Sequence, residues 1–264
     1  MSDLKMNYKT MNVKVDGSIA TVSYCRPAYY NASNAQMRRD RVDIFTQISA
    51  DRNIKVVILT GNEKAFCAGG DLKEFSTCTV EQAQEISEEG YAFQNLIINL
   101  PQPVIAAVSG YAYGGGMESV LMCDLCIASE NATFALPEIN VGFMPGNGGT
   151  QRLVQSISIC KAKELIFFGA QMDAKEALRL GFINLVVPQE ALLDTAREWA
   201  EKLCQKPAIA LQQAKRCINQ AWGRDIDTGM RMESQAWVSL FGTEDQKEGA
   251  KAFLEKRKPL FVGR

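Results

Sequence analysis

Short runs of β-branched and other apolar residues alternate with longer amphipathic stretches along this chain. Residues 13–15, 19–24, 56–60, 104–108 and 184–187 have the length and composition of strands. Apolar positions recur at helical spacing in residues 34–51, 80–99, 161–168, 173–180, 194–204, 208–222, 228–240 and 246–257.

The order of these elements divides the chain into two parts. Strands mixed with helices fill the first two-thirds, and the rest is helical in pattern. The pattern therefore predicts an α/β core over residues 1–195 and a helical region over residues 196–264. One helix has readable ends, because Asp173 is a favourable N-cap and Gly181 a favourable residue after the last turn.

Composition and charge narrow the class of protein. The chain has 264 residues, of which 47% are hydrophobic and 22% charged, with a net charge of −1. These values are typical of a globular protein, and the lack of a basic field argues against a nucleic-acid partner. No apolar run approaches the ~18 residues that would span a membrane. Residues 1–10 mix charged and polar side chains, so we expect a cytoplasmic protein.

The chain contains no histidine. This excludes Ser-His-Asp and Cys-His catalysis and every metal site that needs imidazole. A general acid or base must therefore be Glu, Asp, Lys, Tyr or Cys. Among eight cysteines, Cys123 and Cys126 form one CxxC, but no second pair completes a zinc site, so we expect no metal and buried, reduced thiols.

Three segments are candidates for chemistry. Residues 65–74 (AFCAGGDLKE) place Gly69 and Gly70 after a β-run, as a tight turn or as a backbone open to close approach. Residues 110–124 (GYAYGGGMESVLMCD) join three glycines to an apolar helix that carries Glu118 in its first turn. The N–H groups at such a helix start suit an oxyanion, although glycines there also serve packing of helix on strand.

The third segment covers residues 132–153 (ATFALPEINVGFMPGNGGTQRL), where Glu138 follows a proline in apolar surroundings. A glutamate in such a segment is either a surface residue or a buried acid with a raised pKa. Residues 110–124 lack G-x-G-x-x-G, and the chain lacks G-x-x-x-x-G-K-[ST], so dinucleotide and P-loop sites have no support. Taken together, two glycine turns and two glutamates predict an oxyanion hole with a carboxylate pair.

At these residues the chain resembles the crotonase (enoyl-CoA hydratase/isomerase) family. The resemblance begins at CRPAYYNA (residues 25–32), runs through all three segments and reaches EGAKAFLEKRKP (residues 248–259). It implies a spiral of ββα units with a C-terminal helical region that builds homotrimers, often paired as hexamers. It also implies an enzyme that acts on an acyl-CoA thioester and needs no separate cofactor.

The resemblance also assigns roles to residues. Gly70 and Gly115 would donate the two oxyanion-hole N–H groups, while Glu118 and Glu138 would hold the reacting water as base and acid, in an order left open. Further residues would contact coenzyme A: Ala28, Tyr30, Ala68, Gly70, Asp71, Leu72 and Gly115, with Lys256 reaching a phosphate from a neighbouring subunit.

The chain departs from the family pattern at a few positions. Many relatives have a lysine where Ala28 stands, and an alanine where Gly70 stands. Tyr29 and Tyr30 replace smaller or aliphatic residues and are expected to reshape the nucleotide pocket. The acyl group itself cannot be read from the sequence, since it depends on where residues 75–90 and the side chains of Phe143, Trp237 and Phe241 lie.

The sequence leaves three functions open. The retained glutamate pair favours an enoyl-CoA hydratase, or the reverse dehydratase. An enoyl-CoA isomerase, or a hydratase specialised for carnitine-type or alicyclic acyl groups, would share the same motifs. A non-catalytic relative that binds coenzyme A or RNA would not need the two glutamates. An RNA-binding relative would also need a more basic chain than this one.

Overall fold

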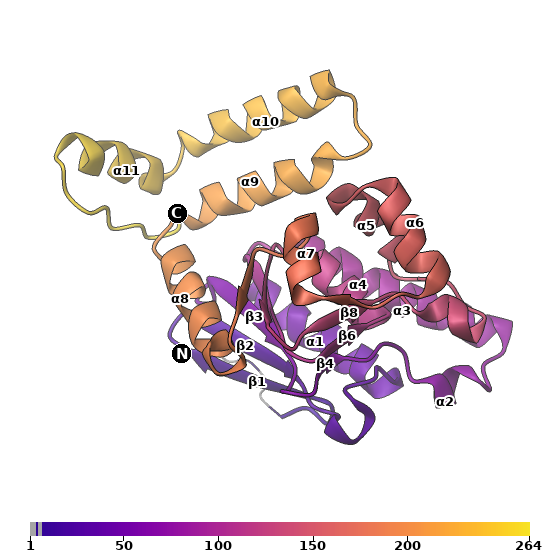
Figure 1. The fold of residues 1–264 in the computed structure, drawn as a ribbon. Helices are drawn as coiled ribbons and strands as arrows, with labels where there is room; N and C mark the ends of the chain where they lie inside the picture. Colours follow the sequence, from indigo (N-terminus) through magenta and orange to yellow (C-terminus); the bar gives the residue numbers. More distant parts are fainter. Residues whose placement is uncertain (1–3, 5–6) are drawn as a thin grey trace.

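Two β-sheets form the body of the molecule in a computed structural model, which describes residue 4 and residues 7–264. The larger sheet has the strand order β1-β2-β3-β5-β7-β10, and the smaller has the order β4-β6-β8-β9. Figure 1 shows helices packed around both sheets and a helical arm that extends from them. The strands are β1 Met11–Asp16, β2 Ile19–Tyr24, β3 Val56–Thr60, β4 Ala65–Cys67, β5 Val104–Val108, β6 Tyr111–Tyr113, β7 Leu125–Ser129, β8 Thr133–Ala135, β9 Met172–Asp173 and β10 Leu185–Val187.

The chain winds as a spiral in which successive turns add one strand to each sheet. β3 is followed by β4, β5 by β6 and β7 by β8, and helices return the chain to the start of the next turn. Strands contributed by successive turns pair in parallel, β3 with β5 and β5 with β7 in one sheet and β4 with β6 and β6 with β8 in the other. The expected spiral of ββα units is confirmed.

Helices supply the rest of each turn and the C-terminal region. Asn34 caps the first by accepting a hydrogen bond from Met37 N, and Asp173 caps α7 by accepting one from Glu176 N, as predicted. Gly181 ends α7 at φ 83°, which confirms the predicted stop. The helices are α1 Ala35–Ala50, α2 Leu72–Phe75, α3 Val80–Asn99, α4 Gly115–Met122, α5 Gly149–Ser156, α6 Ile159–Phe168, α7 Ala174–Leu180, α8 Leu192–Cys204, α9 Ala208–Ala221, α10 Ile226–Leu240 and α11 Glu244–Leu254, with 3-10 turns η1 Pro27–Tyr29, η2 Glu138–Val141 and η3 Gln189–Ala191.

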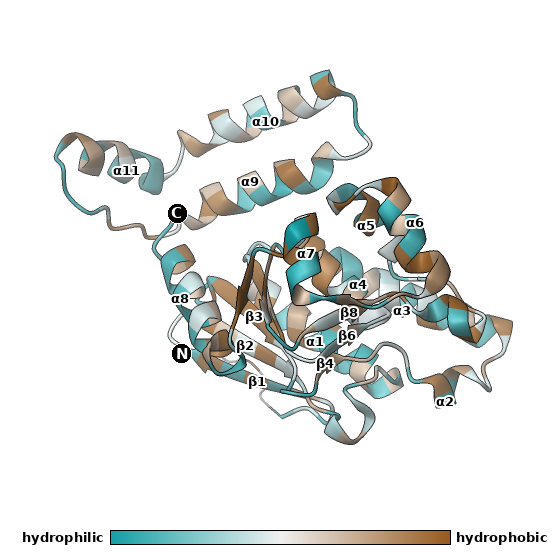
Figure 2. Ribbon diagram, in the orientation of Figure 1, coloured by the Kyte–Doolittle hydropathy of each residue, from teal (hydrophilic) through white to brown (hydrophobic). Residues whose placement is uncertain are grey.

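The main core fills the space between the sheets and their helices. Phe45, Phe66, Phe93 and Phe134 are fully buried there. A second apolar cluster lies on the large sheet, where α8 packs Ala196 and Ala200 onto β3, β5 and β7. Figure 2 shows the apolar colouring gathered on the sheets. In the described part of the chain, no helix is long and apolar enough to cross a membrane.

Helices α9, α10 and α11 extend away from the sheets (Figure 1). Lys215 ties α9 to the body, because its Nζ donates to Asp124 Oδ2 at 2.8 Å and to two backbone carbonyl oxygens. The predicted division at residues 195 and 196 falls inside α8, and that division stays a prediction. Part of the stretch used to expect a cytoplasmic protein, residues 1–3 and 5–6, lies outside the described residues.

The sequence pattern missed five strands, namely β4, β6, β7, β8 and β9. Four of these have at most three residues, too few to show a period of two along the chain. The last helix was also placed too late, since α11 covers Glu244–Leu254 rather than residues 246–257. Thr243 decides its start, because its side chain accepts a hydrogen bond from Gln246 N.

Candidate active site

The segment after β4 presents one backbone N–H of Gly70 toward the interior of the site. Ser33 N donates to Gly69 O at 2.7 Å, and Asp71 N donates to Ser33 O at 3.0 Å. In an extended segment successive N–H groups point to opposite sides. Gly70 N–H therefore points away from the loop that carries Ser33.

The second glycine segment begins helix α4. Gly114 has φ 51° and ψ −124°, a conformation that residues with a side chain rarely adopt, and it turns the chain from β6 into the helix. Gly116 allows close packing, because a Cβ there would overlap the carbonyl oxygen of Cys67 on β4. The first intrahelical bond runs from Glu118 N to Gly114 O at 2.9 Å, so Gly115 N–H lies in the unpaired first turn.

These two segments lie against each other. A Cβ built on Gly69 would lie 3.5 Å from Gly115 N. Within the part of the chain that the structure describes, neither Gly70 N–H nor Gly115 N–H donates a hydrogen bond. Unpaired N–H groups are uncommon inside a folded protein. Two of them side by side can receive an oxygen that carries developing negative charge.

Glu118 is the buried carboxylate of the site, with 1% of its surface exposed. Its Oε1 accepts hydrogen bonds from Asn147 N at 2.7 Å and from Gly149 N at 2.9 Å, where helix α5 begins. Burial raises the pKa of Glu118 above its ordinary value, and the two N–H groups act in the opposite direction. The start of α5 thus supports a negative charge on a carboxylate that burial alone would keep protonated.

Glu138 is the second carboxylate and begins the 3-10 turn η2. A Cβ on Gly114 would lie 3.1 Å from Glu138 Oε1, and one on Gly115 would lie 3.9 Å from Glu118 Oε2, so both carboxylates border the same glycine segment. Glu138 Oε2 is buried and has no hydrogen-bond partner among the described residues. Burial, followed by the charge of Glu118, raises the pKa of Glu138 to about 7.

The structure thus brings together the four residues that the sequence singled out, Gly70, Gly115, Glu118 and Glu138. The two carboxylates share one environment, where a single proton between them is favoured over two negative charges. The two N–H groups lie beside them. Such an arrangement can stabilise an oxyanion while carboxylates move a proton on and off a neighbouring atom.

The residues expected to contact coenzyme A fall into two groups. Ala28 and Tyr30 lie in the loop around η1, and Ala68 N donates to Tyr30 O at 3.0 Å, so this loop borders the Gly70 segment. Asp71 and Leu72 follow Gly70 directly, and Leu72 is exposed. Tyr30 has φ 48°, and its ring is 5.9 Å from that of Tyr111, with both rings partly exposed.

Lys256 lies elsewhere in the chain. It follows α11 at the end of the helical arm, with φ 53°, whereas the glycine segments and both glutamates belong to the body (Figure 1). One chain therefore does not bring Lys256 to the two glutamates. Trp237 and Phe241, which were expected to shape the acyl pocket, pair with each other on α10, whereas Phe143 follows η2 beside Glu138.

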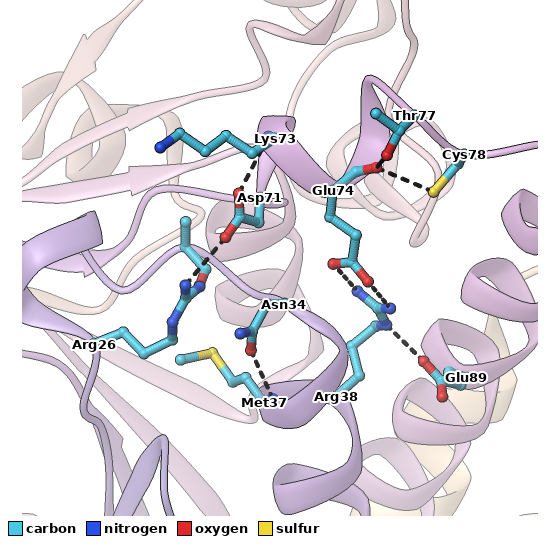
Figure 3. A network of polar contacts seen from close by, with 11 residues as sticks. Arg26, Asn34, Met37, Arg38, Asp71, Lys73, Glu74, Thr77, Cys78 and Glu89 are labelled. Atoms are coloured by element: carbon cyan, nitrogen blue, oxygen red, sulfur yellow. Dashed lines mark hydrogen bonds and ion pairs between the residues drawn. The ribbon is translucent and has the colours of Figure 1, made fainter.

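Several contributors to the site were missed by sequence reasoning. The glycine-rich loop after Glu138 was visible, but its N–H groups at Asn147 and Gly149 were not recognised as donors to Glu118. Arg38 on α1 was also missed, and Figure 3 shows it between Glu74 of α2 and Glu89 of α3. Its place among the buried apolar residues Met37, Ile44 and Phe45 of α1 could have indicated a buried partner.

The cysteines differ in how deeply they are buried. All eight are free, with Cys67 and Cys126 buried and Cys160 exposed. The Cys123 thiol donates to Ser119 O within α4. The described residues contain no group of three or more His, Cys, Asp and Glu side chains placed to hold a metal ion.

The structure is a two-sheet ββα spiral in which two N–H groups with no partner among the described residues lie beside one buried and one partly buried glutamate. Such a site can stabilise an oxyanion and transfer protons. The chain belongs to the enoyl-CoA hydratase/isomerase family, whose model matches residues 14–264. This confirms the resemblance seen in the sequence.

Known relatives align with this chain over nearly its whole length. A probable enoyl-CoA hydratase of Mycobacterium bovis is 40% identical over 98% of this chain and 100% of its own. A short-chain-enoyl-CoA hydratase of Clostridium acetobutylicum is 39% identical over 96% of this chain and 97% of its own. The crystal structure of an enoyl-CoA hydratase from Bacillus anthracis superposes with a TM-score of 0.93 at 40% identity, covering 97% of this chain and 100% of that one.

Proposed function

We propose that this protein is an enoyl-CoA hydratase, which reversibly adds water to a 2-enoyl-CoA and gives a 3-hydroxyacyl-CoA. The observation that carries the proposal is the carboxylate pair, buried Glu118 and partly buried Glu138, beside two N–H groups that have no partner among the described residues. Relatives named as enoyl-CoA hydratases at 39% and 40% identity support it.

The backbone N–H groups of Gly70 and Gly115 would receive the thioester oxygen. When water attacks the β-carbon, electrons move through the double bond and build negative charge on that oxygen. Two fixed donors stabilise this enolate more than the neutral thioester. Losing one such donor typically costs ~3–4 kcal/mol in the barrier.

The two glutamates would divide the proton transfers. Glu118 has two N–H donors on one oxygen, which support the ionised form and suit it as the base that takes a proton from water. Glu138, with a pKa raised to about 7, holds a proton near neutral pH and can give it to the α-carbon. The hydroxyl group adds to the β-carbon, and one proton moves from Glu138 to the substrate while another reaches Glu118.

Coenzyme A would lie against Ala28, Tyr30, Ala68, Asp71 and Leu72, which border the Gly70 segment. Lys256 would reach a phosphate of coenzyme A bound to another subunit, because its own chain holds it on the helical arm. We therefore infer that the protein works as a homotrimer or as a hexamer of two trimers. We also propose that it is cytoplasmic, as the sequence led us to expect.

The test is hydration of crotonyl-CoA in ¹⁸O-labelled water by the wild type and by the Glu118→Gln and Glu138→Gln variants. We expect labelled 3-hydroxybutyryl-CoA from the wild type and a loss of roughly 10²–10⁴ in kcat for each variant. Circular dichroism of the variants controls for folding. Absence of turnover with crotonyl-CoA, longer enoyl-CoAs and carnitine-type or alicyclic thioesters would refute the proposal, and a 3-enoyl-CoA shift without label would indicate an isomerase.

A further inference from the structure

A phenylalanine ring covers the glycine that carries one of the two N–H groups. Phe75 is the last residue of α2, and a Cβ on Gly70 would overlap its Cε2 and lie 2.5 Å from its Cζ. Gly70 is not in the left-handed region of φ, so its backbone would accept alanine. The ring of Phe75, rather than the backbone, therefore excludes a side chain at position 70.

The same ring also meets the segment of the second carboxylate. The rings of Phe75 and Phe143 have centroids 6.0 Å apart and an interplanar angle of 61°, an edge-to-face contact. Phe143 N donates to Glu138 O at 3.0 Å, so Phe143 is tied to the turn that carries Glu138. The pair thus bridges the Gly70 segment and the Glu138 segment, the two sides between which the reacting carbons would lie.

Phe75 is held in place although its helix has one turn. Arg38, with 5% of its side chain exposed, donates from Nη1 and Nη2 to the two oxygens of Glu74 at 3.0 and 2.7 Å, and from Nε to Glu89 at 2.6 Å. At the other end of α2, Arg26 pairs with Asp71 at 3.1 Å, and Asp71 caps the helix (Figure 3). A single helical turn is not stable alone, so these two arginines hold in place the turn that carries Phe75.

We propose that Phe75, with Phe143, sets the length of acyl group that the site accepts, and that it selects short enoyl-CoAs. This inference rests on the proposed function. An acyl chain whose thioester oxygen is at Gly70 and whose reacting carbons lie beside Glu138 meets this aromatic pair with its remaining carbons. Because ion pairs hold both ends of α2, the helix that carries Phe75 cannot shift to admit extra methylenes without breaking them.

The first experiment compares chain lengths in the wild type, Phe75→Ala and, as an exposed aromatic control on α3, Tyr91→Ala. We expect kcat/KM of the wild type and the control to fall at least about tenfold from crotonyl-CoA to 2-octenoyl-CoA. Phe75→Ala should remove most of this preference. An unchanged ratio in Phe75→Ala, or a wild type that uses both lengths equally, would overturn the inference.

Binding separates this inference from the proposed function. Calorimetry with butyryl-CoA and octanoyl-CoA, which cannot be hydrated, reports the same preference whether or not the wild type turns over. If hydration is absent but Phe75→Ala still gains affinity for octanoyl-CoA alone, only the hydratase proposal fails. If hydration is present and Phe75→Ala keeps the wild-type ratio of affinities for butyryl-CoA and octanoyl-CoA, only the proposed role of Phe75 fails.

A double-mutant cycle tests the coupling of Gly70 to Phe75. Gly70→Ala keeps the N–H group but displaces the ring, so we expect a loss of about tenfold or more in kcat/KM for crotonyl-CoA. In the Phe75→Ala background the same change should cost less than about threefold, since the space is then free. Equal losses in both backgrounds would show that the ring does not act at position 70.

Discussion

At the scale of single residues, the two glutamates differ in what surrounds their oxygens. Glu118 Oε1 accepts two backbone N–H groups, whereas the buried Glu138 Oε2 accepts none from the residues that the structure describes. The pair should be active while it shares one proton. With the pKa of Glu138 raised to about 7, kcat/KM for crotonyl-CoA should fall tenfold per unit above that pH. A pH–rate profile measures this fall. A kcat/KM that stays unchanged up to about pH 9 would contradict the prediction.

The raised pKa of Glu138 also has a consequence for stability. The folded state holds this proton up to about pH 7, whereas the unfolded chain releases it near the ordinary value of 4.5. Folding stability should therefore decrease as the pH rises through that interval. Glu138→Gln removes the charge, and we expect it to be more stable than the wild type at about pH 8, by about 1–3 kcal/mol. Urea unfolding at about pH 4 and pH 8 provides the comparison, and a difference independent of pH would contradict the argument.

At the scale of elements, one guanidinium joins three helices. Arg38 lies on α1 and holds Glu74 of α2 and Glu89 of α3 (Figure 3). Arg38→Lys keeps the charge but loses the two parallel bonds to Glu74, so we expect a loss of about 1.5–3 kcal/mol in the free energy of unfolding. It should also weaken the preference for short acyl groups.

A matched control exists on α7. Arg179 makes the same kind of double contact with Glu176, at 2.6 and 2.8 Å, but the arginine is exposed. Arg179→Lys should cost no more than about 1 kcal/mol. Chemical denaturation measures the free energy of unfolding of both variants. Equal losses would mean that burial of Arg38 adds nothing to the strength of its ion pairs.

At the scale of the whole molecule, a buried lysine fastens the helical arm to the body. Lys215 on α9, 9% exposed, donates to Ile97 O, Gln102 O and Asp124 Oδ2. Lys215→Met would leave the carboxylate of Asp124 without its cation, so we expect a loss of about 3–5 kcal/mol in stability. Lys251→Met, at an exposed site on α11, serves as the control in thermal unfolding. A loss below about 1 kcal/mol for Lys215→Met would contradict this role.

The arm also exposes large apolar side chains that one chain leaves uncovered. They include Ile218, Trp222, Met230, Trp237 and Phe241, and Figure 2 shows apolar stretches along α9 and α10. Large exposed apolar patches are typical of interaction sites, so we expect these side chains to lie between subunits. We expect trimers or hexamers in sedimentation equilibrium and a dissociated form of Trp237→Asp. Lys256→Ala should raise KM for crotonyl-CoA without changing kcat. A monomeric wild type would contradict both the expected oligomer and the expected role of Lys256 in a neighbouring subunit's site.

The sequence, with the family resemblance it shows, predicted much of the fold and named four residues that the structure places together. Long periodic helices, the five longer runs of β-branched residues and the caps at Asp173 and Gly181 depend on neighbours along the chain. The short strands escaped notice because their pairing partners, such as Tyr111 for Ala65, lie far apart in sequence. The donors to Glu118 escaped for the same reason, since Asn147 is 29 residues away.

The sequence by itself determined which chemical groups are present: no histidine, two glutamates in apolar segments, and glycines that free backbone N–H groups. The sequence records these groups directly, and the helices that carry them are predictable because periodicity and capping act over a few neighbouring residues. Only the tertiary structure decided which groups meet. Burial of Glu118, the raised pKa of Glu138 and the seating of Phe75 on Gly70 all depend on contacts between turns of the spiral. Desolvation and packing are set by surroundings in space, and no local pattern records them.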